Sequence, residues 1–503
     1  MKTIVILADT LCRRYLPVYE KSAVTLTENI NRIAERSTVF DQHWCGSSPC
    51  MPARRDMFTG RVNFLERNWC GAEPFDHLLP EVLRDHNIYC HMVTDHSNYH
   101  FIGGEGYINA FNSWEVIRGQ EKDPVGGDVI DPTLPPHVGR MDAQHLKNLK
   151  LICNEADYPT PTTLAHAATW LEQNSDADNY MLWVECFDPH EPFDTPQKYL
   201  ELYDNEYDGD SFYWPEYQKK DYTEEQKRHI RKRYMAKLTM MDHWLGKILD
   251  VLDQNNAWDD TMVIFTTDHR FMLGEHGFYG KNYMPAYNEV FHIPFMIHMP
   301  GQFESRRCNA LTQNIDLFPT ILEQFGISSN EALNKIHGKS LLPLLRGECD
   351  SVRDSAIFGN FGLSVNLTDG KYTYFRAAKD DTNMPLYVYG VTPGTIIQRY
   401  GIHTIDDLSS IETGRFLSWT KYPVLKIPAN HIRLKNVFQT FDKRNPYNAK
   451  SMLFDIAHDY AQEHPISDDK LEKKYCDMLS RQMAEHDSPA EQWERLGMKR
   501  ADL

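Results

Sequence analysis

The sequence predicts an α/β protein in which a mostly parallel β-sheet is flanked by helices. Short apolar or β-branched runs recur through the first part of the chain, and amphipathic stretches separate them. This alternation is typical of a parallel sheet with crossover helices. Around Gly347–Arg353 the pattern changes. We therefore expect a first domain at 1–352 and a smaller C-terminal α+β subdomain at 353–503, with a boundary near residue 352.

The first domain should combine buried strands with long packing helices. A helix is expected at Leu26–Arg36, whose apolar residues share one face, and a longer one at Thr223–Gln254, which opens with helix-start residues. The runs expected to form strands are Thr3–Ala8, Tyr89–Thr94, Met181–Cys186, Met262–Thr267 and Pro294–Met299.

The C-terminal subdomain should hold a short antiparallel sheet and a polar helix at Asp468–His486, after strand-like runs at Ser355–Phe358, Lys371–Phe375 and Leu386–Tyr389. Two long polar stretches, Arg118–Arg140 and Asp204–Tyr222, interrupt the alternation of the first domain. We expect both to be loops over the strand ends, where loops often determine specificity.

Charge and composition exclude several classes of function. The chain of 503 residues has 53 Lys and Arg against 71 Asp and Glu, a formal charge of −18, so nucleic acid and anionic membranes are not expected partners. No run approaches the roughly 18 apolar residues of a membrane span. The first residues lack a signal-peptide pattern, and the ten cysteines are scattered without a C-x-x-C pair. We therefore expect a cytoplasmic protein. Nothing in the pattern predicts an oligomeric state.

The most informative stretch is Ser48-Pro49-Cys50-Met51-Pro52-Ala53-Arg54, which is followed by Thr59-Gly60-Arg61. Pro52 suits the first turn of a helix, so Cys50 would lie where free N–H groups and the helix dipole attract an anion. Arg54 would point a fixed cation at the same place. A thiol here could be a nucleophile, and the alternative is a buried structural cysteine.

Other segments place acidic and basic residues after the expected strands. Asp9 follows Ile6-Leu7-Ala8, and Asp268-His269 follows Phe265-Thr266-Thr267, so both lie at the carboxyl edge of the sheet, where α/β proteins form sites. His190 lies in Asp188-Pro189-His190-Glu191-Pro192, and Lys281 follows Leu273-Gly274-Glu275-His276-Gly277.

Together these segments resemble the sulfatase family, in which C-x-P-[SA]-R is the sequence whose cysteine a maturation enzyme oxidises to formylglycine. The resemblance covers nearly the whole chain and implies an alkaline-phosphatase-like fold. It also implies hydrolysis of a sulfate monoester, with a small sulfated sugar or aryl sulfate as substrate. The hydrated aldehyde at residue 50 would offer one oxygen to attack sulfur and a second to expel the sulfate afterwards.

The resemblance further implies a role for each site residue. Asp9, Asp268 and His269 would bind one divalent cation with the oxygen of residue 50; hard oxygen donors favour Ca²⁺, and Mg²⁺ or Mn²⁺ stays open. The catalytic residues would be Cys50, Arg54, His96, His190 and Lys281. Arg54 and Lys281 would neutralise the sulfate, and His190 or Lys281 would protonate the leaving oxygen. Where many sulfatases have G-K-x-H, this chain has Val93-Thr94-Asp95-His96 without the lysine, and His96 is the remaining candidate to take the proton that releases the covalent sulfate.

Two positions depart from the family pattern. Thr10 stands where sulfatases usually carry a second Asp, which removes one hard ligand and one negative charge. Arg270 replaces the Gly after the Asp-His pair, and we expect its side chain to be solvated. The missing carboxylate leaves the identity of the metal open and would allow a more highly charged substrate.

Two other functions compete with the sulfatase hypothesis. A phosphonate monoester or phosphodiester hydrolase would use the same formylglycine and the same Asp-His metal pair, and Thr10 favours it slightly. A catalytically silent protein that keeps the fold and the anion pocket is the second alternative. Retention of the whole set of reactive residues argues against it.

Overall fold

The computed structural model describes residues 1–100, 104, 106–203, 206–391, 407–432 and 443–501. Its largest sheet has eight strands in the order β12-β2-β11-β8-β1-β6-β4-β5. The central strand β1 (Lys2–Ala8) is parallel to both β6 (Tyr180–Cys186) and β8 (Thr261–Thr266). The other strands are β2 (Thr38–Trp44), β4 (Tyr89–Thr94), β5 (Ser113–Val116), β11 (Phe295–His298) and β12 (Arg306–Gln313). Only β11 runs antiparallel to its neighbours in this described sheet, so the predicted mostly parallel sheet is confirmed.

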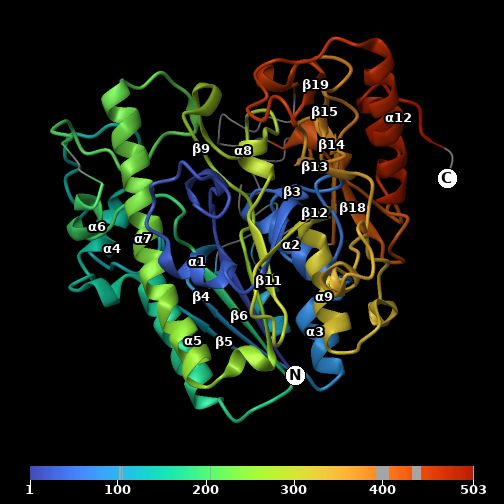
Figure 1. Cartoon of the computed structure of the whole chain (residues 1–503). Helices are drawn as coiled ribbons and strands as arrows, with labels where there is room; N and C mark the ends of the chain where they lie inside the picture. Colours follow the sequence, from blue (N-terminus) through green and yellow to red (C-terminus); the bar gives the residue numbers. More distant parts are fainter. Residues whose placement is uncertain (101–103, 105, 204–205, 392–406, 433–442, 502–503) are drawn as a thin grey trace.

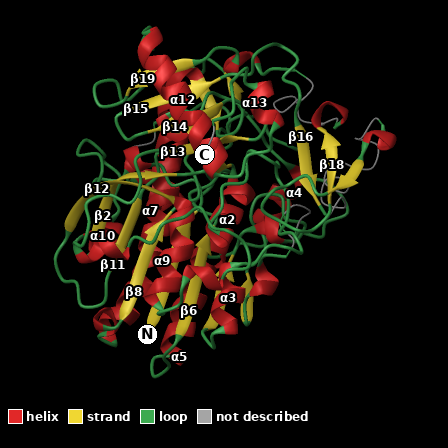
Figure 2. Cartoon of the chain, turned by 90° about the vertical axis from the view of Figure 1, so that its right-hand side faces the viewer, coloured by secondary structure: helices red, strands yellow, loops and turns green. Residues whose placement is uncertain are grey.

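Helices cover both faces of this sheet (Figures 1 and 2). On one face, β1 residues Ile4 and Ile6 belong to the same apolar core as α1 (Glu28–Ala34), α5 (Pro159–Gln173) and α7 (Glu224–Gln254). On the other face, Val5 and Leu7 share a core with α2 (Cys50–Thr59), α3 (Leu79–Asp85) and α9 (Leu317–Gln324). Because β1 is buried on both sides, its sequence is continuously apolar, as parallel central strands require.

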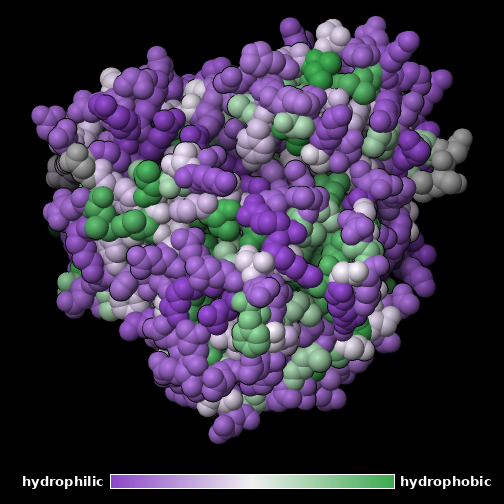
Figure 3. Space-filling view, viewed as in Figure 1, coloured by the Kyte–Doolittle hydropathy of each residue, from purple (hydrophilic) through white to green (hydrophobic). Residues whose placement is uncertain are grey.

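The predicted elements lie close to the observed ones. The five expected strands correspond to β1, β4, β6, β8 and β11, and the two expected helices to α1 and α7. Thr223 caps α7 in a capping box with Gln226, so the start signal in the sequence has the expected structural cause. None of the described helices is long and apolar enough to cross a membrane. The face in Figure 3 is mostly hydrophilic, with apolar side chains scattered over it.

A second sheet lies in the upper right of Figure 1, beside α12 (Asp469–Glu485). Its strand order is β19-β15-β14-β13-β3. β13 (Ala356–Asn360), β14 (Val365–Thr368), β15 (Tyr372–Arg376) and β19 (Met452–Asp455) pair antiparallel, as expected after residue 352. β3 (Ser47–Ser48) comes from the first domain, however. The division of the chain near residue 352 therefore stays a prediction.

A third, small sheet of β16 (Tyr387–Gly390), β18 (Val424–Pro428) and β17 (Glu412–Gly414) lies at the edge of the molecule in Figure 2. The two predicted loops have the expected irregular character. The described part of Arg118–Arg140 contains no helix or strand, and the described part of Asp204–Tyr222 contains only the short strand β7 (Gln218–Lys219).

Candidate active site

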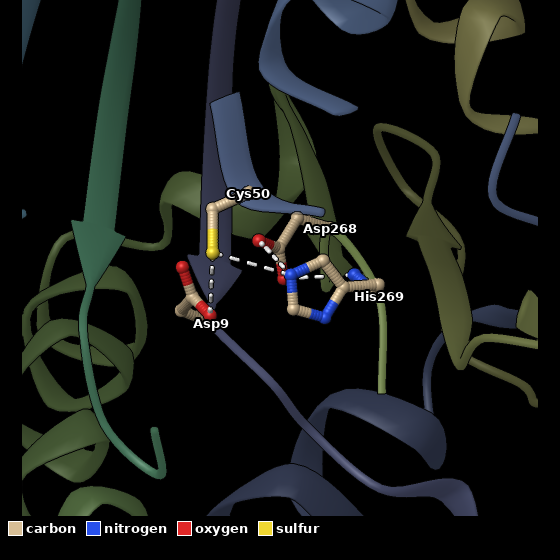
Figure 4. A group of neighbouring side chains, drawn as sticks. All are labelled: Asp9, Cys50, Asp268 and His269. Carbon is tan, nitrogen blue, oxygen red and sulfur yellow. Dashed lines mark hydrogen bonds and ion pairs between the residues drawn. The ribbon is translucent and has the colours of Figure 1, made fainter. Parts of the chain in front are cut away.

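Four buried side chains meet at the carboxyl edge of the large sheet (Figure 4). Asp9 follows β1, and Asp268 and His269 follow β8, the strand next to it. Cys50 is the first residue of α2 and points at the same place from the helix N-terminus. One ligand atom from each of Asp9, Cys50, Asp268 and His269 lies within 4.8 Å of the others. The four predicted metal ligands are therefore brought together, although more than 200 residues of sequence lie between Cys50 and Asp268.

The geometry and chemistry of this group fit a divalent cation. The four ligand atoms lie within 4.8 Å of one another, which is close enough for all of them to reach one cation at ligand distances of about 2.3–2.6 Å. Nδ1 of His269 lies 3.1 Å from the backbone oxygen of Arg270, which can only accept a hydrogen bond. Nδ1 therefore carries the hydrogen, and Nε2 keeps its lone pair 3.3 Å from the Cys50 sulfur. Burial lowers the pKa of His269 to about 4, so this ring is neutral and able to bind a cation at pH 7.

Arg54 holds the carboxylates of this site in place. Its guanidinium is fully buried and donates to Asp9 Oδ2 at 2.8 Å, to Asp268 Oδ2 at 2.7 Å and to Glu185 Oε1 at 2.7 Å. A further N–H donates to the backbone oxygen of Cys50 at 3.0 Å. Three carboxylates use the fork of Arg54, two of them metal-ligand candidates, and its predicted contact with a bound anion stays a prediction.

Glu185 is a site residue that the sequence analysis missed. It lies near the end of β6, is fully buried, and also accepts hydrogen bonds from Tyr99 Oη at 2.9 Å and Trp183 Nε1 at 3.2 Å. A carboxylate inside the apolar run Trp183–Cys186 was the available signal, since a charge on a central strand needs a buried partner.

Thr10 adopts an unusual backbone conformation beside the metal-ligand set. Its φ of 64° is in the left-handed region, which β-branched residues rarely occupy. The strain is held by side-chain contacts: Thr10 Oγ1 donates to Asp9 Oδ1 at 2.6 Å and accepts from Lys281 Nζ at 3.2 Å. At the position where the sequence resemblance predicts a second carboxylate, this chain therefore has a hydroxyl and a nearby ammonium group.

A cavity of about 580 Å³ opens in front of Cys50. His190 and Lys281 line it together with Cys50, so three of the predicted catalytic residues share one cavity. Both predicted loops contribute to its walls, through Glu121, Lys122 and Arg140 from one loop and Glu216, Tyr217 and Gln218 from the other. A cavity of this size accommodates a ligand much larger than sulfate.

The hydrogen bonds of His190 define its tautomer. Its Nδ1 is within hydrogen-bond distance of the backbone oxygen of Glu191, so Nδ1 carries the hydrogen and Nε2 is left for another partner. Burial and the nearby ammonium of Lys281 lower the pKa of His190 well below its usual value. The ring is therefore neutral in the ligand-free protein, and an anion that offsets Lys281 would favour its protonation.

His96 is oriented differently from the expected base. Nδ1 of His96 accepts the backbone N–H of Asn98 at 3.2 Å, so Nε2 carries the hydrogen and lies 3.3 Å from Asp9 Oδ2. A base must present a lone pair to the group that loses a proton, and the lone pair of this ring is already used. The observed geometry supports His96 as a partner of the ligand Asp9 rather than as a base.

Arg270 corrects one expectation directly. The side chain is only 2% exposed, and Nη1 donates to the backbone oxygens of Asn288 at 3.0 Å and His292 at 2.9 Å. The expectation that Arg270 is solvated is therefore wrong: the cation is buried because α8 (Asn288–Phe291) and the residue that follows it supply backbone acceptors.

Comparison with known proteins agrees with this arrangement. The family model described as Sulfatase matches residues 2–327. The chain is 25% identical to a choline-sulfatase of Rhizobium meliloti (strain 1021) over 383 residues, which is 70% of this chain and 73% of that protein. Among solved structures, a phosphonate monoester hydrolase of Agrobacterium radiobacter is similar with a TM-score of 0.66 at 17% identity, covering 96% of both chains. A protein bound to its substrate D-glucosamine-2-N,6-O-disulfate has a TM-score of 0.65 at 15% identity, covering 96% of this chain and 97% of that one.

Proposed function

Because the chain belongs to the sulfatase family, we propose that it hydrolyses a sulfate monoester to an alcohol and inorganic sulfate, with residue 50 oxidised to formylglycine as the nucleophile. One observation carries the proposal. Cys50 lies at the N-terminus of α2, 3.3 Å from His269 and within 4.8 Å of all three other ligand candidates, at the wall of a cavity that also contains His190 and Lys281.

The environment of Cys50 supports oxidation to an oxygen nucleophile. Burial and the carboxylate of Asp9 raise the pKa of the Cys50 thiol well above its usual value. An unmodified thiol would therefore stay protonated at pH 7, and a protonated thiol is a poor nucleophile. A hydrated aldehyde does not depend on thiolate formation, and its oxygens match the hard cation that the carboxylates favour.

Asp9, Asp268 and His269 would hold one divalent cation with the oxygen of residue 50. Ca²⁺ is favoured by the two carboxylates, and Mg²⁺ or Mn²⁺ is compatible with the single imidazole. When bound, the cation would act as a Lewis acid that withdraws charge from the sulfate oxygens. Arg54 would keep both carboxylates aimed at this point by its buried ion pairs.

Lys281 and His190 would act on the substrate from the cavity. Burial opposes the charge of Lys281, but the carboxylates of Glu191 and Asp9 raise its pKa, so the ammonium is charged at pH 7. It would neutralise the sulfate as negative charge develops. His190, protonated in the presence of the anion, would donate from Nε2 to the leaving oxygen.

A phosphonate monoester hydrolase is the second candidate, because a phosphonate monoester carries the same single negative charge as a sulfate monoester and presents similar oxygens to the site. Thr10, whose hydroxyl lies 3.2 Å from Lys281 Nζ, leaves the site less negative than a second carboxylate would, which suits either anion. The similar Agrobacterium structure supports the fold only.

The test compares matured, metal-loaded protein on 4-nitrophenyl sulfate and on phenyl phosphonate esters. We expect formylglycine at residue 50 by peptide mass spectrometry and a higher kcat/KM for the sulfate. Cys50→Ser should be nearly inactive while its melting temperature stays close to that of the wild type. A higher kcat/KM for the phosphonate would favour the second candidate. Full activity of an unmodified thiol would contradict the mechanism, and no turnover of any ester would support a silent protein.

The proposed mechanism also requires a partner, the enzyme that oxidises residue 50. Formylglycine requires a maturation enzyme, so co-expression with one should raise the fraction of oxidised residue 50 and the activity in parallel.

We also propose a cytoplasmic location, because the ten cysteines are scattered along the sequence and fit a reducing compartment. Cell fractionation would test it.

A further inference from the structure

The two loops that line the cavity are joined at a fixed point. Val138 donates its backbone N–H to Ser211 at 2.9 Å, and Arg140 donates its own to Trp214 at 2.7 Å. Gly139 lies between them with a φ of 76°, and a Cβ at this position would be 2.3 Å from the backbone oxygen of Trp214. Only glycine allows this approach. The backbone of Arg140 is therefore held in a defined position at the cavity wall.

The side chain of Arg140 is ordered without being neutralised. Its guanidinium carbon lies 4.2 Å from the ring centroid of Trp214, which is fully buried, and 6.0 Å from that of Tyr217. Within the described part of the chain, no carboxylate lies within 4.0 Å of this half-buried guanidinium, and the guanidinium donates no hydrogen bond. Stacking occupies the face of a guanidinium and leaves its N–H edge available. That edge has the geometry that binds a carboxylate or sulfate by two parallel hydrogen bonds.

Tyr217 connects Arg140 to the reaction centre. Its ring faces Arg140, and its hydroxyl donates to Glu191, the residue that follows His190. Cys50, His190, Tyr217 and Arg140 all line the same cavity. The side chain of Tyr217 therefore lies between Arg140 and the segment that carries His190, the expected acid for the leaving group. The alcohol part of a bound ester would lie between the two.

The carboxylates of the cavity do not cancel this charge. Glu191 is 1% exposed and accepts from Tyr217, and Glu216 is contacted by Gln218 and by Lys220 at 3.3 Å. Among the described side chains, Glu121 has no cation within ion-pair distance, but Arg140 and the exposed Lys122 are both cations without a carboxylate partner. The groups left for a ligand therefore carry a net positive charge.

We propose that the alcohol part of the substrate carries a second acidic group, a carboxylate or a second sulfate, and that Arg140 binds it. The substrate class is then a short acidic sulfated sugar, such as a sulfated uronic acid or a disulfated sugar. A short substrate fits better than a long polyanion, because the formal charge of the protein is −18. This inference rests on the proposed sulfatase activity and adds a specificity-determining residue to it.

The experiment compares substrates that differ only in the second charge. Glucose 3-sulfate, glucuronic acid 3-sulfate and glucose 3,6-disulfate are assayed with matured, metal-loaded protein. Wild-type protein should have a higher kcat/KM for one or both acidic sugars than for glucose 3-sulfate. Comparison of glucuronic acid 3-sulfate with glucose 3,6-disulfate shows whether the second acidic group is a carboxylate or a sulfate. Arg140→Gln should raise KM for the preferred acidic sugar by about 10- to 100-fold, the usual range for a charged hydrogen bond, with little change in kcat. The neutral sugar should change by less than about threefold, and Arg140→Lys should lie in between.

Arg36→Gln is the matched control. Arg36 also stacks on a tryptophan, Trp258, at 4.7 Å, but it does not line the cavity. Its substitution should leave all three KM values unchanged. If Arg140→Gln raised KM equally for the acidic and the neutral sugars, the proposal would be overturned. Glucosamine 3-sulfate is assayed as well, because a preference of the wild-type protein for this cationic sugar would also overturn the proposal and would indicate binding by Glu121.

A binding measurement keeps this test independent of turnover. Cys50→Ala protein is titrated calorimetrically with glucuronic acid 3-sulfate and glucose 3,6-disulfate, and Arg140→Gln is added to the same background. We expect the double variant to bind the preferred acidic sugar about 10- to 100-fold more weakly. If activity is absent but this difference is present, the proposed function fails and the acidic subsite stands. Activity without such a difference would reject the subsite alone.

Discussion

Arg54 shows how one residue can organise several others. Its guanidinium binds three buried carboxylates, two of which are metal-ligand candidates. Three negative charges close together would repel each other in a low-dielectric site, and the planar fork offsets them while fixing their directions. The C-x-P-x-R spacing then has a structural reason: Arg54 is one helical turn after Cys50 and donates to its backbone oxygen.

The contact between His96 and Asp9 gives a prediction about a single residue. Because its Nε2 lies 3.3 Å from Asp9 Oδ2, His96→Ala should weaken the affinity for the divalent cation by about 10- to 100-fold, as is common when the partner of a metal ligand is removed. His96→Gln can still donate to Asp9 and should recover part of the affinity. The readout is a metal titration monitored by calorimetry.

The same variant tests the role as a base that the sequence predicted for His96. In that case His96→Ala would bind metal normally, give a burst of product, and then stall with sulfate attached to residue 50. Intact-protein mass spectrometry during turnover would detect this adduct. Normal metal affinity together with a trapped adduct would contradict the orientation argument and restore the role as a base.

At the scale of secondary structure, α7 supports the loop that carries His190. Lys237 Nζ from this helix donates to the backbone oxygen of Pro192 at 2.9 Å and lies 3.0 Å from Asp188 Oδ1, with Asp194 Oδ1 at 3.9 Å. Lys237 is 3% exposed. The position of His190 in the cavity therefore depends on a buried ion-pair group that lies outside the cavity.

Lys237→Met should consequently destabilise the protein. Removing one partner of a buried ion pair typically costs about 3–5 kcal/mol, since the other charges stay buried without compensation. The free energy of unfolding from urea titration is the measurement. Lys227→Met is the control on the same helix, because Lys227 pairs with Asp221 and Glu224 at the exposed surface. Its unfolding curve should stay close to that of the wild type, and equal losses in both variants would contradict the argument.

Asp194, which lies near Lys237, gives a prediction about how stability depends on pH. Burial alone would raise the pKa of Asp194, but Lys237 and His145 together lower it below its ordinary value. A carboxyl whose pKa is lower in the folded state adds stability above its unfolded pKa of about 4, and this contribution is lost as the pH falls below that value. The difference in unfolding free energy between wild type and Asp194→Asn should therefore be largest near pH 7 and should shrink below pH 4. A difference that is constant from pH 3 to 7 would refute this.

Sequence patterns predicted the secondary structure better than the contacts between elements. Strands such as β1 and β8 are marked by apolar runs, and the metal-ligand candidates follow strands whose ends must share one sheet edge. The partners of these residues could not be predicted in the same way. Lys237 and Arg270 are buried only because distant segments supply acceptors, and charged residues in a sequence usually indicate solvent exposure.

At the scale of the whole molecule, the C-terminal part of the chain helps to position the nucleophile. β3 precedes Cys50 and pairs with β13: Ser47 lies opposite Gly359, and the N–H of Gly359 donates to Gly46 at 2.9 Å. Phe64 and Ile315 from the first domain also share an apolar core with Ile357 and with residues of α12. The sequence pattern changes near residue 352, yet the contacts cross that position.

This arrangement predicts that the fragment 1–352 is not an independent folding unit. Without β13, the edge of β3 would be unpaired and the apolar core around Phe64 and Ile315 would be exposed to water. We expect the fragment to melt without a cooperative transition, or at a much lower temperature than the full chain, and to be cleaved rapidly near residues 44–65 by a low concentration of protease. Adding fragment 353–503 should restore protection in that segment. If fragment 1–352 instead melted in one sharp transition within a few degrees of the full chain, the boundary near residue 352 would mark a true domain, and the pairing of β3 with β13 would be dispensable for holding Cys50.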